Sequence, residues 1–175
     1  RLYALRPHEI QFGILKRLRG TPIIRHTEPY GLVFDPYPPY TILATDRIDF
    51  VTMQRLVRFA RYWDLIANSG RFANTLPLIL GDTPFNNFMT LSDWLYAKTD
   101  ATHRIALERL AALLVEWLTS RGMAEDKAAE VLSSDYAGQA NKLHIKKKTS
   151  TSEKSAKHAA KIDALPQRQA RHLAR

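Results

Sequence analysis

The residues whose types and spacing could do chemistry lie in one stretch of the chain, RLVRFARYWDLIANSGRF, residues 55–72. Polar side chains recur along it at three- and four-residue steps, at Arg61, Asp64, Asn68 and, past a glycine, Arg71. On one side of a helix, an arginine, a carboxylate and an amide can satisfy each other's hydrogen bonds. We therefore predict a surface for docking another domain, with binding of an anionic substrate as the alternative. No nucleophile, base or metal ligand lies nearby in the sequence, so we predict no catalytic residue here.

A helix must position these side chains, and the same stretch supplies its apolar face. Large apolar residues recur at the matching spacing, at Met53, Leu56, Phe59, Trp63 and Ile66. This pattern predicts an amphipathic α-helix with these five residues in the core. Asp49 suits the N-cap, and Gly70 suits the left-handed residue that closes the helix. A simpler interpretation stays open, in which the charged face is only solvated.

The composition excludes several classes of site. The 175 residues are 45% hydrophobic, which suffices for one ordinary domain or slightly more. There is no cysteine, and the six histidines do not pair at a spacing typical of metal ligands, so we predict no metal site in this chain. No apolar run approaches the roughly 20 residues that span a bilayer, and no signal-peptide pattern is present. These observations predict no membrane partner and a cytoplasmic location.

Positive charge is concentrated at the C-terminal end. Residues 1–141 hold 16 Lys and Arg against 15 Asp and Glu, whereas residues 142–175 hold 10 against 2. The basic segment is poor in large apolar residues, so we predict a flexible tail. Lys146, Lys147 and Lys148 could contact nucleic acid weakly. The alternative is a solubilising tail without a partner, because no aromatic residues alternate with the basic ones.

The remaining pattern predicts a mainly α fold, a helical bundle preceded by one short strand. Residues 10–18, IQFGILKRL, have the length and apolar content of a buried strand. Gly20, Thr21 and Pro22 then form a turn, with proline at the first position of a short helix that ends near Thr27. Residues 35–40, DPYPPY, must be extended. Apolar periodicity and glycine or Thr-Pro boundaries predict further helices over residues 76–80, 84–98, 105–121 and 125–137.

Four sequence segments together resemble a known family. The segment FGILKRLRGTPIIRH, residues 12–26, resembles the closing strand and following turn of radical S-adenosylmethionine barrels. The segments PPYTILATD and RYWDLIANSGRF resemble the C-terminal domain of unknown function that follows the barrel in cobalamin-binding members. RQARHL, at residues 168–173, is similar to the way such chains end.

The resemblance implies a domain order and a set of cofactors. Residues 1–30 would be the end of the barrel, 31–141 a helical C-terminal domain and 142–175 the basic tail. It implies S-adenosylmethionine, a 4Fe-4S cluster and cobalamin in a longer protein, whose barrel and cobalamin-binding domain would be the partners of this chain. Gly20, Thr21 and Pro22 would lie near the mouth of the barrel, and hence near substrate or cofactor; their alternative role is a plain turn and helix cap.

Without cysteine this chain cannot supply the CxxxCxxC ligands of that family, so it is not expected to be catalytic alone. The function indicated is an accessory C-terminal domain that stabilises or covers the barrel. The alternative is a stand-alone helical interaction module whose basic tail binds nucleic acid or an acidic partner. An in-frame CxxxCxxC upstream of Arg1 would favour the first interpretation.

Overall fold

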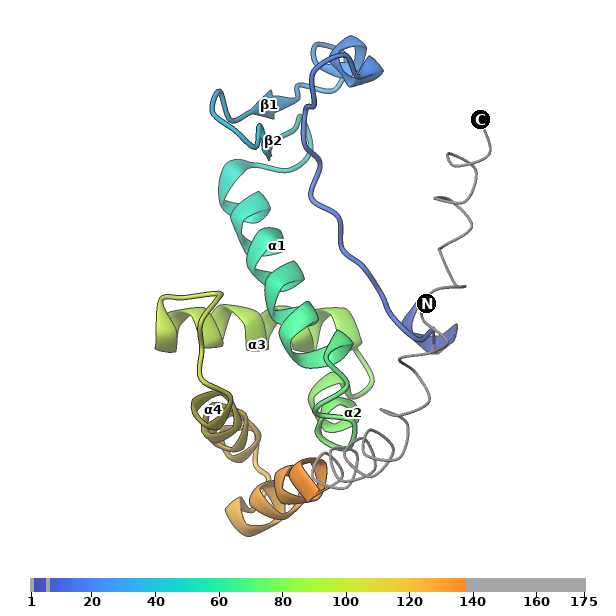
Figure 1. Ribbon diagram of the computed structural model, residues 1–175. Helices are drawn as coiled ribbons and strands as arrows, with labels where there is room; N and C mark the ends of the chain where they lie inside the picture. The colour runs from blue at the N-terminus through green and yellow to red at the C-terminus, as the bar shows by residue number, and fades with distance from the viewer. Residues whose placement is uncertain (1, 6, 138–175) are drawn as a thin grey trace, which may run out of the picture. The chain divides into compact units, whose positions relative to one another are not determined.

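The fold is mainly helical, as the sequence predicts, with one short two-stranded sheet (Figure 1). The computed structural model describes residues 2–5 and 7–137. Residues 1–135 form one compact unit, and a second unit begins at Tyr136. The domain boundaries predicted after residues 30 and 141 stay a prediction.

The central helix begins and ends where its sequence signals lie. Helix α1 (Phe50–Trp63) starts at Asp49, whose Oδ1 accepts a hydrogen bond of 2.7 Å from the backbone N–H of Thr52. The helix then widens into a π-helical turn, η3 (Asp64–Asn68). Gly70 follows with a φ of 65°, the left-handed conformation expected at a helix end. The predicted N-cap and stop are confirmed, whereas the π turn was not predicted.

The helices after this turn also follow their sequence signals. They are α2 (Thr75–Leu80), α3 (Pro84–Thr99), α4 (Leu107–Ser120) and helical residues 125–137. Gly81 closes α2, proline occupies the first turn of α3, and Asp100 ends α3 with a left-handed φ of 48°. Each predicted helix is therefore present, with bounds shifted by no more than about two residues, the usual uncertainty of helix ends.

An aromatic cluster holds α1 against α3. Trp63 stacks on Phe59 with ring centroids 5.8 Å apart, and both rings meet Phe88 edge-on, at 4.9 and 5.0 Å. Four of the five apolar residues predicted for this face are buried, while Leu56 is only half-buried. Such ring geometry adds about 0.5–1.5 kcal/mol per pair to the gain from burial. The cluster fixes α1, and with it the polar residues on its other side.

Two polar contacts join elements that are distant in sequence. The guanidinium of Arg55 on α1 donates hydrogen bonds to the carboxylate of Asp93 on α3 and forms an ion pair with it, with a shortest N–O distance of 2.6 Å. Asp135, which is 5% exposed, caps α2: it accepts hydrogen bonds from the backbone of Asn74 and from the backbone and hydroxyl of Thr75. The helical residues before Asp135 are thereby attached to the start of α2.

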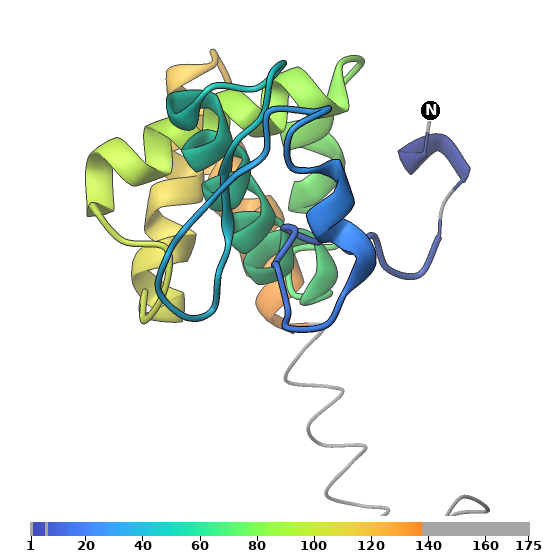
Figure 2. The same ribbon diagram turned by 90° about the horizontal axis from the view of Figure 1, so that it is seen from above.

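The sheet lies at the N-terminal end of α1. Strand β1 (Val33–Phe34) pairs antiparallel with β2 (Ile42–Ala44). Residues 10–18 run extended beside α1 towards this hairpin (Figure 1). The view from above shows the chain around the hairpin in front of the helices, with the first residues to one side (Figure 2). A short 3-10 helix, η2 (Pro22–His26), follows the segment and confirms the helix predicted there; another, η1 (Tyr3–Leu5), precedes it.

The prediction of a buried strand over residues 10–18 is wrong, because this segment forms no strand in the described structure and is mostly exposed. The segment forms a single bridge, Lys16 to Thr41, and within it only Ile10 is buried. Phe12 and Leu18 are 40% and 59% exposed. Apolar content gave the extended backbone correctly, but it could not show that the described residues leave one side of the segment uncovered.

Candidate functional site

The N-terminal segment is fastened to the end of the central helix by one amide side chain. Asn68 accepts a hydrogen bond from the backbone N–H of Ile10 at 3.3 Å and donates one to its carbonyl at 3.0 Å. Asn68 also donates to Oδ1 of Asp64, at 2.8 Å, four residues earlier. The carboxylate thus holds the amide in the orientation that serves both groups of Ile10. Asn68 is the last residue of the π turn, a distortion often found at functional positions of helices.

Arg61, another residue of the predicted docking surface, takes no part in this contact. Arg61 is exposed and lines a groove of about 740 Å³ between α1 and residues 12–18. Among the described residues it makes no hydrogen bond or ion pair with Asp64 or Asn68. Arg71 lies beyond Gly70, exposed, and its backbone N–H donates to the hydroxyl of Ser69. The structure therefore joins Asp64 and Asn68 by a hydrogen bond and places Arg61 with Asp64 in the wall of one groove.

Residues 11–16 present an open backbone edge. The N–H of Arg17 donates to the carbonyl of Tyr40, and the carbonyl of Leu15 accepts from Ile42, so these odd-numbered residues face the hairpin. Alternate residues of an extended chain face opposite edges, which turns the backbones of Ile14 and Lys16 the other way. Within the described part of the chain, no N–H of residues 11–16 donates a hydrogen bond.

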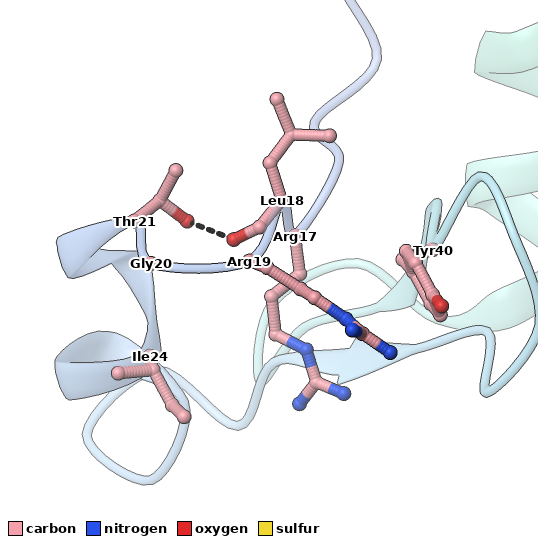
Figure 3. Close-up of a pocket in the computed structure, with 7 residues that line it drawn as sticks. All are labelled: Arg17, Leu18, Arg19, Gly20, Thr21, Ile24 and Tyr40. Atoms are coloured by element: carbon pink, nitrogen blue, oxygen red, sulfur yellow. Dashed lines mark hydrogen bonds between the residues drawn. The ribbon is translucent and has the colours of Figure 1, made fainter.

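The Gly-Thr-Pro turn forms one wall of a separate pocket. Gly20 takes a φ of 76°, and the hydroxyl of Thr21 donates to the carbonyl of Leu18 at 2.6 Å. The pocket has a volume of about 640 Å³ and is lined by Gly20, Thr21 and five further residues, Arg17, Leu18, Arg19, Ile24 and Tyr40 (Figure 3). Pro22, the third residue predicted near a ligand, starts η2 and does not line the pocket.

Two arginines give this pocket its charge. Figure 3 shows the side chains of Arg17 and Arg19 extending from the turn into the space between Ile24 and Tyr40. The guanidinium of Arg17 lies over the ring of Phe34, 5.4 Å from its centroid. In the described part of the chain neither arginine has an ion-pair partner. Sequence reasoning did not single out these arginines, although two basic residues two positions apart before a Gly-Thr turn are a usable signal.

Tyr40, which lines the pocket, has an unusual backbone conformation. Its φ of 57° is rare for a residue with a large side chain. Two hydrogen bonds maintain this conformation: its N–H donates to the carbonyl of Tyr37 at 2.8 Å, and its carbonyl accepts from Arg17 at 3.0 Å. The second bond connects Tyr40 directly to one of the arginines. Sequence reasoning expected an extended chain over residues 35–40, whereas the bond between Tyr40 and Tyr37 closes a turn there.

Among the described residues, no three His, Asp or Glu side chains gather into a set that could hold a metal ion. In the same residues, no helix has the length and apolar character needed to cross a bilayer. The candidate site has three parts. The amide clamp is the contact of Asn68 with Ile10, the open edge is the backbone of residues 11–16, and the arginine pocket is the one lined by Arg17 and Arg19.

The sequence family described as Protein of unknown function (DUF4080) matches residues 28–174. The chain belongs to this family. No curated protein and no solved structure matches the chain. Asp64 and Asn68 lie within the DUF4080 match, as does Tyr40, whereas the extended segment and the Gly-Thr-Pro turn precede it.

The DUF4080 match also includes most of the basic tail. The predicted nucleic-acid contacts Lys146, Lys147 and Lys148 fall in this part of the sequence and lie outside the described residues.

Proposed function

We propose that this DUF4080 chain is the accessory C-terminal domain of a cobalamin-dependent radical S-adenosylmethionine enzyme, where it stabilises and covers the barrel. The observation that carries the proposal is the open edge at residues 11–16. Unpaired N–H and C=O groups beside exposed apolar side chains are the template onto which another strand adds. A barrel strand of the same protein is the occupant that the sequence resemblance implies.

The amide clamp supports this role. Asn68 ties the extended segment to the domain that matches the family, while the outward backbones of Ile14 and Lys16 stay available. A segment fixed on one side and open on the other can connect a helical domain to a neighbouring sheet. The start of the family match at residue 28 also agrees with a segment that belongs to a preceding domain.

The chain itself does not fit the cofactors of such an enzyme. It has no cysteine, so it offers no thiolate for a 4Fe-4S cluster. In our proposal the cluster, S-adenosylmethionine and cobalamin are held by the preceding domains, and no step of the reaction is assigned to a residue of this chain. Its contribution is to the association and stability of those domains.

The proposal is tested first on the gene and then on the protein. The coding sequence upstream of Arg1 should contain an in-frame CxxxCxxC. A start codon immediately before Arg1, with no such motif, would contradict the proposal and leave the stand-alone interaction module.

In the longer protein, Lys16→Pro should weaken association of the barrel with this domain, because proline removes the outward N–H needed by an added strand. Lys16→Ala is the matched control, since it removes the same exposed charge and keeps the N–H. Limited proteolysis and thermal melts should show a looser protein only with proline. In the chain described here both variants should melt alike, since that N–H donates to no described residue. Equal behaviour of the two variants in the longer protein would exclude strand addition at this edge.

A further inference from the structure

The arginine pocket has the composition of an anion site. Arg17 and Arg19 bring two permanent positive charges to one hollow whose lining contains no acidic residue. Holding two like charges together costs free energy, and a bound dianion offsets that cost for both at once. Each guanidinium also presents a planar fork of N–H donors that matches the oxygens of a phosphate.

The residues around the two arginines favour binding of a ligand. The ring of Phe34 supports the guanidinium of Arg17 from one face by a cation–π contact, which leaves the N–H groups in the guanidinium plane free for a ligand. Gly20 and Tyr40, on opposite walls, both take left-handed backbone conformations. Tyr40 has a large side chain, so its conformation costs free energy, and residues held in this way concentrate at ligand sites. The described residues give the hydroxyl of Tyr40 no hydrogen-bond partner.

The remaining lining indicates the rest of the ligand. Leu18 and Ile24 are apolar, largely exposed residues of the lining, and Figure 3 shows Ile24 and the ring of Tyr40 on either side of the two arginines. A volume of about 640 Å³ is in the usual range for a site that binds a small molecule. An inorganic ion alone would leave this apolar lining without a contact.

We propose that Arg17 and Arg19, together with Tyr40, bind the phosphate group of a small phosphate monoester whose apolar part rests on Leu18, Ile24 and the tyrosine ring. This binding site is separate from strand addition at residues 11–16 and does not depend on it. The two proposals can therefore fail independently.

The test is a calorimetric titration of the full chain with phenyl phosphate, with benzoate as a carboxylate of similar shape. The lysines of the basic tail also attract phosphates, so the titration is done in a background with Lys146→Gln, Lys147→Gln and Lys148→Gln. We expect saturable binding of phenyl phosphate that is at least about tenfold tighter than that of benzoate, because only the ester carries a double charge. Equal affinity for both, or no saturable binding of phenyl phosphate, would overturn the proposal.

Variants then assign the binding to the pocket. Arg17→Gln and Arg19→Gln should each weaken phenyl phosphate binding by about tenfold or more, the usual effect of losing a charge-assisted hydrogen bond. Arg25→Gln removes the same charge from an exposed residue of η2 outside the pocket and should have little effect. Arg19→Lys should restore only part of the affinity, because it keeps the charge without the fork.

A loss in Arg17→Gln and Arg19→Gln that does not exceed the loss in Arg25→Gln would contradict the assignment. A second measurement does not depend on whether the variants fold, because it follows the Nε–H resonances of the arginines in the wild-type chain. In the folded wild-type chain, the signals of Arg17 and Arg19 should shift on addition of phenyl phosphate while that of Arg25 stays in place. Shifts confined to other arginines would also contradict the assignment.

Discussion

At the scale of single residues, Asn68 carries the contact between the start of the chain and its helical body. An amide is suited to this task because it combines a donor and an acceptor in one plane, as the backbone itself does. It therefore satisfies both the N–H and the carbonyl of Ile10. Asp64 adds an acceptor for the second N–H of the same amide group. The contact resembles one rung of a β ladder made by a side chain.

Asn68→Asp should loosen this contact, because a carboxylate cannot donate to the carbonyl of Ile10 and would face the charge of Asp64. The free energy of unfolding should fall by about 1–3 kcal/mol, the usual cost of leaving a partly buried polar group unpaired. Urea melts measure the loss, and amide exchange at Ile10 should become faster. The control Asn86→Asp introduces the same charge at an exposed position of α3. Similar melts and exchange rates for the two variants would show that the clamp contributes nothing.

Tyr62 gives the fold a dependence on alkaline pH. Its hydroxyl donates to the carbonyl of Ala101 at 2.7 Å, and burial raises the pKa of the phenol above its usual range, because the charged form would lose its hydration. A raised pKa means that the folded state holds the proton more tightly than the unfolded state. The stability from this group is complete below the usual value of about 10 and is lost as the pH rises through the higher folded value.

The free energy of unfolding should therefore decline above about pH 10, and the decline should be shallower in Tyr62→Phe. Urea melts at a series of pH values measure both slopes. Tyr37→Phe is the control, since Tyr37 is 74% exposed. An unchanged slope in Tyr62→Phe would mean that other groups cause the alkaline loss.

Sequence reasoning at this scale found part of the site. The four-residue spacing correctly placed Asp64 beside Asn68, since helical periodicity is a local property. The partner of Asn68 is 58 residues away, at Ile10, and no local pattern reports such a contact. The arginine pocket was missed for the same reason, because Tyr40 reaches Arg17 only through the path of the intervening loop.

At the scale of elements, α1 owes its position to its aromatic face. Trp63 contacts Phe59 and Phe88 within the helices, and Phe12 of the extended segment meets it edge-on at 5.5 Å. One side chain thus links three elements. The periodic spacing predicted its burial correctly, since it is 4% exposed.

Trp63→Ala should lower the free energy of unfolding by about 3–5 kcal/mol, through lost burial and the cavity left behind. Denaturant melts followed by circular dichroism give the value. Trp94→Ala is a useful comparison, because Trp94 is only half-buried and should cost less. A loss for Trp63→Ala below about 1 kcal/mol would place its ring outside the core.

The sequence was less informative about the burial of residues 10–18 and about the π turn. Residues 10–18 have the composition of a buried strand, yet the described residues cover mainly Ile10. Composition records that apolar surface needs a cover but does not say which part of a protein supplies it. The π turn was missed because one extra residue in a helix leaves no distinct mark on a short apolar repeat.

At the scale of the whole molecule, most of the net positive charge lies in a different part of the chain from the contacts that hold the helices together. Residues 1–141 are nearly neutral, with 16 basic against 15 acidic residues, while the 34 residues that follow carry most of the net charge of +9. The contacts that hold the described helices together involve residues up to Asp135. Stability and attraction to polyanions should therefore be separable.

Deletion of residues 145–175 should leave the melting temperature nearly unchanged and remove any salt-sensitive binding of DNA or RNA, since such binding comes from basic side chains releasing counterions. Thermal melts and titration with single-stranded DNA at two salt concentrations test both parts. A control deletion of residues 163–175 keeps Lys146, Lys147 and Lys148 and should retain part of the binding. A large fall in melting temperature on the longer deletion would show that the tail contributes to the fold.

The π turn also determines how the chain can change in length during evolution. In α1 each residue turns the helix by about 100°, so deleting one residue from η3 would restore ordinary α-helical pairing but rotate everything after it by that angle. Asn68 would then point away from Ile10, and Gly70 would send the chain in another direction. Insertions and deletions should consequently be rare between Trp63 and Gly70 among homologues, even where exposed positions in the same turn exchange freely.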